Sequence, residues 1–342
     1  MLYVGADVHL RSSVVCILDE NGREIKTRSI RGGWKNLVEV LRGLKEPFAV
    51  CYEASCGYGV LYDALKGVAH RVTVAHPGQL RLIFRSKRKN DRVDARKLAK
   101  LLFLDEVPPV HVPRFEVRSW RELIEYRHRV VEKRTRVKNG LRTLLRGCGI
   151  VTPGRSRLWS SRGQEWLRDL EFVSPLHALR RDLMQSELEQ FNEQIRRVEA
   201  ELNRIGTQHP GVTLLQTIPG VGPRTAEAVV AYIDDPHRFR RSKCVGSYFG
   251  LVPSQDASGG MNHLGRITRE GPGTVRRLLI EATWQGIRRS VHLKAHYERV
   301  GRGDPERRKI ALVATAHHLV RSMHAMLMTS EEWNESPRKS AA

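Results

Sequence analysis

"YVGADVHLRSSVVCILDENG", residues 3–22, predicts how the N-terminal part of the chain folds. Two apolar runs within it, "YVGADV" and "SSVVCILD", have the length and the content of branched side chains that are typical of β-strands. Asn21 and Gly22 follow the second run, and this pair favours the tight turn of a β-hairpin into "ENGREI". The stretch therefore predicts a meander of strands at the start of the chain.

Further strands and helices alternate after this meander. "PFAVCYEA" (47–54) and "RVTVAHP" (71–77) are short apolar runs typical of strands. "NLVEVLRGL" (36–44), "GVLYDALKGV" (59–68) and "DRVDARKLAKLLFL" (91–104) have apolar residues at helical spacing. Strands that first form a meander and then alternate with helices predict an α/β domain over residues 1–112.

The rest of the chain is predicted to be mainly helical. Over 113–205, two long stretches carry an apolar seam with Lys and Arg on the remaining surface, which predicts an antiparallel helical arm or coiled coil. We expect 149–166 to be a loop between the two helices. A third domain is expected over 206–330, with a loop at 250–273, and the tail, 331–342, is expected to be disordered.

The formal net charge of +22 selects polyanionic partners, either nucleic acid or an anionic membrane surface. No apolar run has the length of a bilayer span, so we expect no membrane crossing. The N-terminus lacks the pattern of a signal peptide, which favours a cytoplasmic protein. Aromatic residues make up only 6% of the chain, which disfavours broad stacking platforms for single strands. Nucleic acid is therefore the partner that the composition favours.

Metal sites built on cysteine or histidine are disfavoured. The five cysteines form no CxxC pair, and an odd number argues against a disulfide framework. His292 and His296 have a spacing found in zinc sites, but no third ligand is near in the sequence. His317 and His318 are interpreted in the same way. We expect no zinc site.

Four acidic residues point to a different metal site. Asp91 and Asp94 lie three residues apart, so on a helix they share one face at its first turn. Asp7 and Glu53 each lie at the end of an apolar strand, where an acid is costly unless it is paired or binds a metal. Each acid alone could cap a helix or pair with an arginine. Together they are typical of a divalent-cation site for phosphodiester chemistry, and we expect Mg²⁺.

Several residues near the C-terminus are candidates for contacts with DNA. Gly220 and Gly222 lie in the turn "IPGVG", which either presents backbone N–H groups to phosphates or simply connects two helices. Arg266 and Arg269 are plausible phosphate clamps, although solvated surface arginines explain them equally well. Arg276 adds a further cationic position that is a candidate for nucleic-acid binding. Gly265 and Arg277 lie in the same region.

Two serines of the loop at 250–273 are candidate nucleophiles. Ser258 is followed by Gly259 and Gly260, which would let the backbone approach a phosphate closely. Ser254 is its rival in the same loop. A serine hydroxyl needs activation by a base or a metal, and from the residues alone Ser258 is an ordinary loop serine.

The same stretches resemble a known family. "YVGADVHLRSSVVCILDENG", "CYEASCGYGVLYDAL" and "KNDRVDARKLAKLL" are similar to the N-terminal domain of the transposases of the insertion sequence 110 family, also called DEDD transposases. The resemblance implies a RuvC-like fold of the RNase H type, with Asp7, Glu53, Asp91 and Asp94 as metal ligands. "TIPGVGPRTAEAVVAYI" and the stretch around "DASGG" resemble the family's C-terminal transposase domain, which implies that Ser258 is the nucleophile.

The resemblance implies a DNA recombinase that moves an insertion sequence through a covalent phosphoserine intermediate. It also implies guidance by a noncoding bridge RNA that pairs with donor and target DNA, and dimers that assemble into a tetramer. One alternative is a hydrolytic nuclease or Holliday-junction resolvase, in which water attacks and Ser258 is structural. A second alternative is an architectural protein without catalysis.

Overall fold

The computed structural model describes residues 1–83, 90–154, 156–258 and 261–335. The chain divides into two compact units, Met1–Phe115 and Glu116–Ala342. The helical arm expected over 113–205 lies in the second unit except for its first three residues, and the domain expected over 206–330 lies wholly in it. The boundary at 205 therefore stays a prediction.

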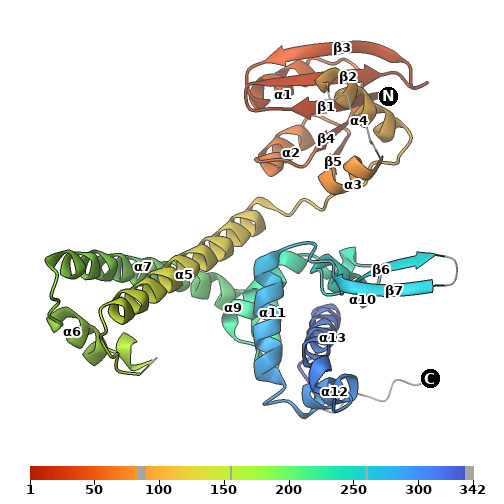
Figure 1. The fold of residues 1–342 in the computed structure, drawn as a ribbon. Helices are drawn as coiled ribbons and strands as arrows, with labels where there is room; N and C mark the ends of the chain where they lie inside the picture. Colours follow the sequence, from red (N-terminus) through yellow and green to blue (C-terminus); the bar gives the residue numbers. More distant parts are fainter. Residues whose placement is uncertain (84–89, 155, 259–260, 336–342) are drawn as a thin grey trace. The chain divides into compact units, whose positions relative to one another are not determined.

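A five-stranded mixed sheet forms the centre of the first unit (Figure 1). Its strands are β1 (Leu2–Val8), β2 (Ser12–Leu18), β3 (Glu24–Arg31), β4 (Phe48–Glu53) and β5 (Arg71–Ala75), in the order β3-β2-β1-β4-β5. The first three strands pair antiparallel, while β1 pairs parallel with β4 and β4 with β5. The predicted meander followed by alternating strands and helices is confirmed.

Helices cover both faces of this sheet. Side chains that alternate along a strand point to opposite faces, and in β1 Val4 and Ala6 join one core cluster with α1 (Trp34–Arg42) and α2 (Tyr58–Lys66). On the other face, residues of β2 and β4 pack against α4 (Asp91–Phe103), and α3 (Pro77–Ile83) adds Leu80 to this side. This arrangement of a mixed sheet between helices is compatible with the RuvC-like α/β fold.

A close contact between β1 and α4 fixes the position of that helix. The ring of Tyr3 packs edge-on against Phe103, with 5.3 Å between the ring centroids. Two residues further along β1, a Cβ atom on Gly5 would lie 2.1 Å from the carbonyl oxygen of Ala95 and 2.3 Å from the amide nitrogen of Ala99. Only glycine permits this approach. Because Tyr3 contacts Phe103 and the later residue Gly5 lies beside the earlier residues Ala95 and Ala99, α4 runs antiparallel to β1 and begins beside the strand's carboxyl end.

Two long helices, α5 (Phe115–Gly147) and α7 (Pro175–Gln208), form the first part of the second unit. They run antiparallel, since Arg127 donates to Glu199 and, further along α5, Arg134 donates to Asn192. The two predicted long helices are confirmed, and their description as a coiled coil stays a prediction.

The predicted loop at 149–166 is wrong in part. It contains a 3-10 turn, η1 (Arg157–Trp159), and the start of α6 (Ser161–Asp169). Ser160 caps α6 by accepting a hydrogen bond from the Gly163 amide. A Cβ atom on Gly163 would lie 2.1 Å from the Arg157 carbonyl oxygen. Glycine, which the sequence suggested as a loop residue, is therefore needed here so that α6 can pack closely against η1.

The remaining helices share one apolar core. They are α8 (Pro210–Gln216), α9 (Pro223–Ile233), α10 (Ser242–Tyr248), α11 (Gly273–Gly286), α12 (Val291–Gly301) and α13 (Arg308–Thr329). The 3-10 turns η2 (Pro236–Arg238) and η3 (Pro305–Arg307) connect them and contain no buried residue. No helix in the described ranges has the length and apolar composition needed to span a membrane.

Two further predictions are corrected here. The expected loop at 250–273 contains an antiparallel pair of strands, β6 (Pro253–Ser258) and β7 (Met261–Ile267). The start of the expected disordered tail is ordered, because the Trp333 amide donates to Thr217 and Glu335 accepts from Ser290 and from the His292 amide. Residues 336–342 lie outside the described ranges.

Candidate active site

Asp7 and Glu53 come from neighbouring strands of the first unit. β1 and β4 run parallel with Ala6 opposite Tyr52, so Asp7 and Glu53 are the next residues along each strand. By the alternation along a strand, both project to the face that α4 covers. The hydroxyl of the buried Tyr52 donates to the Tyr58 carbonyl at 2.6 Å, which holds the turn that follows Glu53.

The first turn of α4 carries the other two acids. Asn90 caps this helix, because its side chain accepts a hydrogen bond from the Arg92 amide at 3.0 Å. Asp91 and Asp94 follow in the first turn, where the helix dipole favours negative charge. Asp94 lies 3.7 Å from the ammonium group of Lys97. The close packing at Gly5 thus places two carboxylates beside the carboxyl end of β1.

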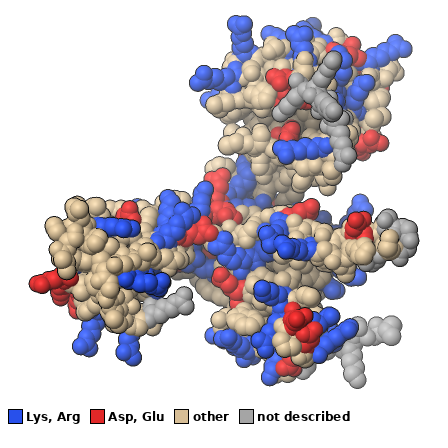
Figure 2. All heavy atoms as spheres, in the orientation of Figure 1, with Lys and Arg blue, Asp and Glu red and all other residues tan. Residues whose placement is uncertain are grey.

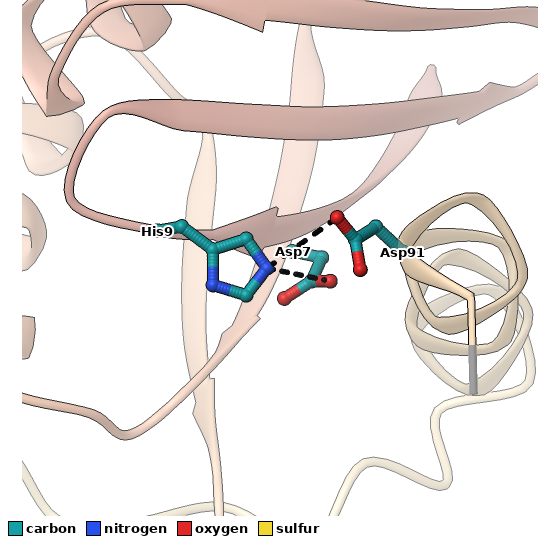
Figure 3. A group of neighbouring side chains, drawn as sticks. All are labelled: Asp7, His9 and Asp91. Atoms are coloured by element: carbon teal, nitrogen blue, oxygen red, sulfur yellow. Dashed lines mark ion pairs between the residues drawn. The ribbon is translucent and has the colours of Figure 1, made fainter.

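Three side chains converge at this point: Asp7, His9 and Asp91 (Figure 3). The Nε2 atom of His9 lies 3.3 Å from an Asp7 oxygen and 3.6 Å from an Asp91 oxygen. One ligand atom from each of the three residues lies within 4.8 Å of the other two. This group includes two of the four predicted acids, whereas Glu53 and Asp94 do not belong to it.

The electrostatics of this group suit a cation. Burial raises the pKa of Asp7 above its ordinary value, and the charges of Asp91 and Asp94 raise it further, while His9 lowers it. Like charges held this close repel one another unless a positive charge lies among them. Carboxylate oxygens are the ligands that Mg²⁺, Ca²⁺ and Mn²⁺ prefer. These residues therefore fit a divalent cation.

Sequence reasoning missed His9. The residue lies two positions after Asp7, and this spacing on a strand directs both side chains to the same side. A D-x-H pattern at the end of an apolar strand was the available signal. Its side chain is half exposed, so it stays accessible from solvent beside the acids.

Ser258 belongs to the second unit. It is the last residue of β6, and its backbone pairs with Met261 of β7. Gly259 and Gly260 lie outside the described residues. The rival Ser254 faces the partner strand, because a Cβ atom on Gly265 would lie 2.4 Å from the Ser254 hydroxyl oxygen. The candidate nucleophile is thus at the turn end of a hairpin.

The two glycines of the turn between α8 and α9 differ in their surroundings. Gly220 has a φ of 92°, and a Cβ atom there would lie 2.5 Å from the Gly286 amide nitrogen. Gly220 therefore serves the packing of the turn on α11. Gly222 is exposed with open space around it, so its predicted contact with DNA stays a prediction.

The three candidate arginines also differ. Arg276 donates to the carbonyl oxygens of Phe249 and Glu270 at 3.0 and 2.8 Å, so it holds the segment that follows β7. Burial lowers its pKa, and Arg269 lowers it further. Arg269 has a positive φ of 57° and is exposed, as is Arg266 of β7. Contacts of these arginines with phosphates stay predictions.

Positive side chains are spread over both units. Figure 2 shows Lys and Arg on each of them over the drawn face, with fewer Asp and Glu. The full chain has 59 Lys and Arg against 37 Asp and Glu. A surface of this kind attracts the phosphates of nucleic acids.

Comparisons with known proteins agree with these features. A model of DEDD transposases of the IS110 group, described as "Transposase", matches residues 4–150, and the "Transposase IS116/IS110/IS902 family" model matches residues 212–298. The chain is 28% identical to the transposase for insertion sequence element IS1111A of Coxiella burnetii, over 87% of this chain and 83% of that protein.

Two further relatives cover similar shares. A probable family 20 transposase of Pseudomonas aeruginosa is 27% identical over 91% of this chain and 88% of its own length. The putative transposase y4qE of Sinorhizobium fredii is 27% identical over 82% of this chain and 71% of its own length. The first family model covers the first unit and continues through α5 into the second, and the other model lies within the second unit. The relatives span both units. The chain is therefore a DNA transposase that belongs to the insertion sequence 110 (IS110) family.

Proposed function

We propose that this transposase cuts and rejoins DNA through a covalent phosphoserine intermediate, with Ser258 as the nucleophile and Asp7, Glu53, Asp91 and Asp94 as ligands of Mg²⁺. The observation that carries the proposal is the convergence of Asp7 and Asp91 from β1 and α4. Asp94 contributes to the same electrostatic field, since it raises the pKa of Asp7. Glu53 is the next residue along the strand beside β1.

The cation would polarise the scissile phosphate and stabilise the charge on the leaving oxygen. The acids of this chain hold it at the edge of the sheet, where the packing of α4 at Gly5 fixes the distance between two of them. Their own mutual repulsion makes the site selective for a positive charge over an anion.

The serine step balances without any external energy source. The Ser258 hydroxyl loses its proton, its oxygen forms a bond to phosphorus, and the bond from phosphorus to the 3′ oxygen of DNA breaks. The 3′ oxygen leaves as a hydroxyl after taking up a proton. The 3′ hydroxyl of the partner strand then attacks the phosphoserine and releases the serine. One phosphodiester is replaced by another, so the exchange needs no ATP.

We further propose that a noncoding bridge RNA guides the enzyme to donor and target DNA, and that dimers assemble into a tetramer. The charge of +22 supports this, because RNA and two duplexes bring many phosphates that must be neutralised. The reaction would take place in the cytoplasm, at the nucleoid of a prokaryotic cell.

Two variants of the full-length protein test the mechanism. With donor DNA, target DNA and guide RNA, Ser258→Ala should abolish both strand joining and the protein–DNA adduct seen on a denaturing gel. Asp91→Asn should abolish cutting, because the cation loses a ligand. Ser254→Ala is the matched control and should keep both activities.

The hydrolytic alternative gives a different result. If water is the nucleophile, Ser258→Ala keeps cutting DNA and the wild-type protein forms no adduct. An adduct that persists in Ser258→Ala and disappears in Ser254→Ala would move the nucleophile to the rival serine.

A further inference from the structure

We propose that His9 is a ligand of the cation held by the acids and that it makes the site prefer Mn²⁺ to Mg²⁺. The inference rests on the proposed function, because it takes the acids to be metal ligands. It adds a nitrogen to a set of ligands that was otherwise composed of oxygen.

The geometry brings His9 to the same point in space as the acids. Residues 7 and 9 lie on the same side of the chain at the end of β1, and Asp91 begins α4 opposite them. The single atom Nε2 of His9 faces both carboxylates, at 3.3 and 3.6 Å (Figure 3). Ligand atoms bound at adjacent positions of one ion are about 3 Å apart when each bond is about 2.1 Å long. The three atoms thus need only small shifts to share an ion.

The neighbours of the ring favour this role over a purely structural one. The Asp7 side chain is 19% exposed, while those of His9 and Asp91 are 49% and 52% exposed. The imidazole and the Asp91 carboxylate are therefore about half open to solvent, and an ion can reach the group. A histidine that served packing would be covered by apolar side chains, as the residues of the sheet's core are.

The chemistry of imidazole sets the preference between metals. Mg²⁺ binds oxygen almost exclusively and keeps several waters, whereas an imidazole nitrogen suits borderline transition metals. Mn²⁺ accepts both carboxylate oxygen and imidazole nitrogen. A site with two carboxylates and one imidazole is therefore expected to bind Mn²⁺ more tightly than Mg²⁺.

The test measures metal binding by the full-length protein without DNA. Mn²⁺ alone is titrated and free Mn²⁺ is followed by its electron paramagnetic resonance signal, and Mg²⁺ affinity comes from competition. His9→Gln should lose roughly tenfold or more in Mn²⁺ affinity with little change for Mg²⁺. Pulsed resonance should show coupling of bound Mn²⁺ to nitrogen in the wild type and not in His9→Gln.

Two controls keep the outcomes distinct. His70→Gln changes an exposed histidine of the same unit and should leave affinity and nitrogen coupling unchanged. Asp91→Asn should weaken binding of both metals. If Asp91→Asn does so but His9→Gln keeps the Mn²⁺ preference and the coupling, the role of His9 is overturned and the acid site stands. If the wild type binds no Mn²⁺, or Asp91→Asn binds it normally, the acid site fails and the His9 inference fails with it.

Discussion

Asp7 in the first unit and Glu227 in the second both have a raised pKa, but their surroundings differ. Burial is the main cause for each, and it raises the pKa of Glu227 to about 7. The charges next to Asp7 include two further aspartates, which also raise its pKa. Glu227 is 1% exposed, and its carboxylate lies 3.1 Å from the guanidinium of Arg224, one turn earlier on α9. Glu227 thus has a permanent positive charge beside it, whereas Asp7 lies beside the His9 imidazole and two further carboxylates.

The difference indicates that Glu227 serves the packing of α9, whereas Asp7 is placed where a cation could bind. Arg224 also hydrogen-bonds to Asn203 of α7, so the pair around Glu227 ties α9 to a neighbouring helix. Within its cluster, Asp7 lies 3.3 Å from the Nε2 atom of His9 and close to two further aspartates. A carboxylate kept among like charges at the edge of a sheet lowers stability unless a cation binds. We therefore expect the stabilisation by added metal to depend on Asp7 and not on Glu227.

The largest expected effect comes from closing the space that lets α4 approach β1. Gly5→Val should displace α4, because the added Cβ atom would lie 2.1 Å from the backbone of Ala95. Overpacking costs about 1–3 kcal/mol or more, and backbone atoms relieve such a clash poorly. Hydrogen exchange should become faster in peptides from β1 and α4 and stay unchanged in α9, and DNA cutting should be lost.

Gly67→Ala is the matched control for this variant. A Cβ atom on Gly67 would lie 4.0 Å from the nearest heavy atom, and its φ is negative. This control should keep wild-type exchange rates and activity. Normal cutting by Gly5→Val would mean that the site does not depend on the distance between β1 and α4.

A smaller effect is expected from the cation itself. Mg²⁺ or Mn²⁺ at about 100 times its Kd should stabilise the first unit of the wild-type protein by about 2.7 kcal/mol, which slows hydrogen exchange in β1. Asp7→Asn should lose this response. Without metal, Asp7→Asn should be more stable than the wild type, because a half-buried charge and its repulsion from Asp91 are removed.

Glu227→Gln is the comparison variant, and it should keep the full stabilisation by the cation. The two acids would prove equivalent if Asp7→Asn still gained stability from metal, or if Glu227→Gln lost that gain. Either outcome would mean that Asp7 has no special role in binding the cation compared with Glu227.

The sequence predicted most of the first unit because its signals are local. The apolar runs of β1 and β4 end in Asp7 and Glu53, and the amphipathic pattern of residues 91–104 places Asp91 at the start of α4. Each of these features depends on residues that are neighbours in the chain. The convergence of Asp7 with Asp91 could then be expected from the rule that strands alternate and helices pack on sheets.

The missed features depend on contacts between distant residues. β6 and β7 consist largely of exposed polar residues and glycine, so no alternation of apolar side chains marks them as strands. The helix α6 contains Gly163, which only tertiary packing explains. Trp333 and Glu335 are held by residues more than forty positions away. The local D-x-H pattern at His9 is a weak signal on its own, and it points to a cluster only when the fold brings Asp91 to 3.6 Å from His9.

The last prediction concerns the pH dependence of Glu227, whose pKa in the folded protein is about 7 against an ordinary value of 4.5. The folded state therefore holds a proton that the unfolded state releases between these values. This contribution to stability is fully present below pH 4.5 and is lost as the pH rises through 7. Glu227→Gln keeps the shape without the titration, so relative to the wild type its stability should increase as the pH rises from 4.5 to above 7.

Chemical denaturation at pH 5 and pH 8 measures this difference, and the other titrating groups cancel because both proteins contain them. Glu193→Gln on α7, a half-exposed acid paired with Arg196, should change stability by less than about 0.5 kcal/mol at either pH. If Glu227→Gln and the wild type lose stability in parallel, Arg224 fully compensates the buried charge. Of these two acids, only Asp7 would then have a raised pKa. The difference between Asp7 and Glu227 would come from the aspartates beside Asp7 and not from burial.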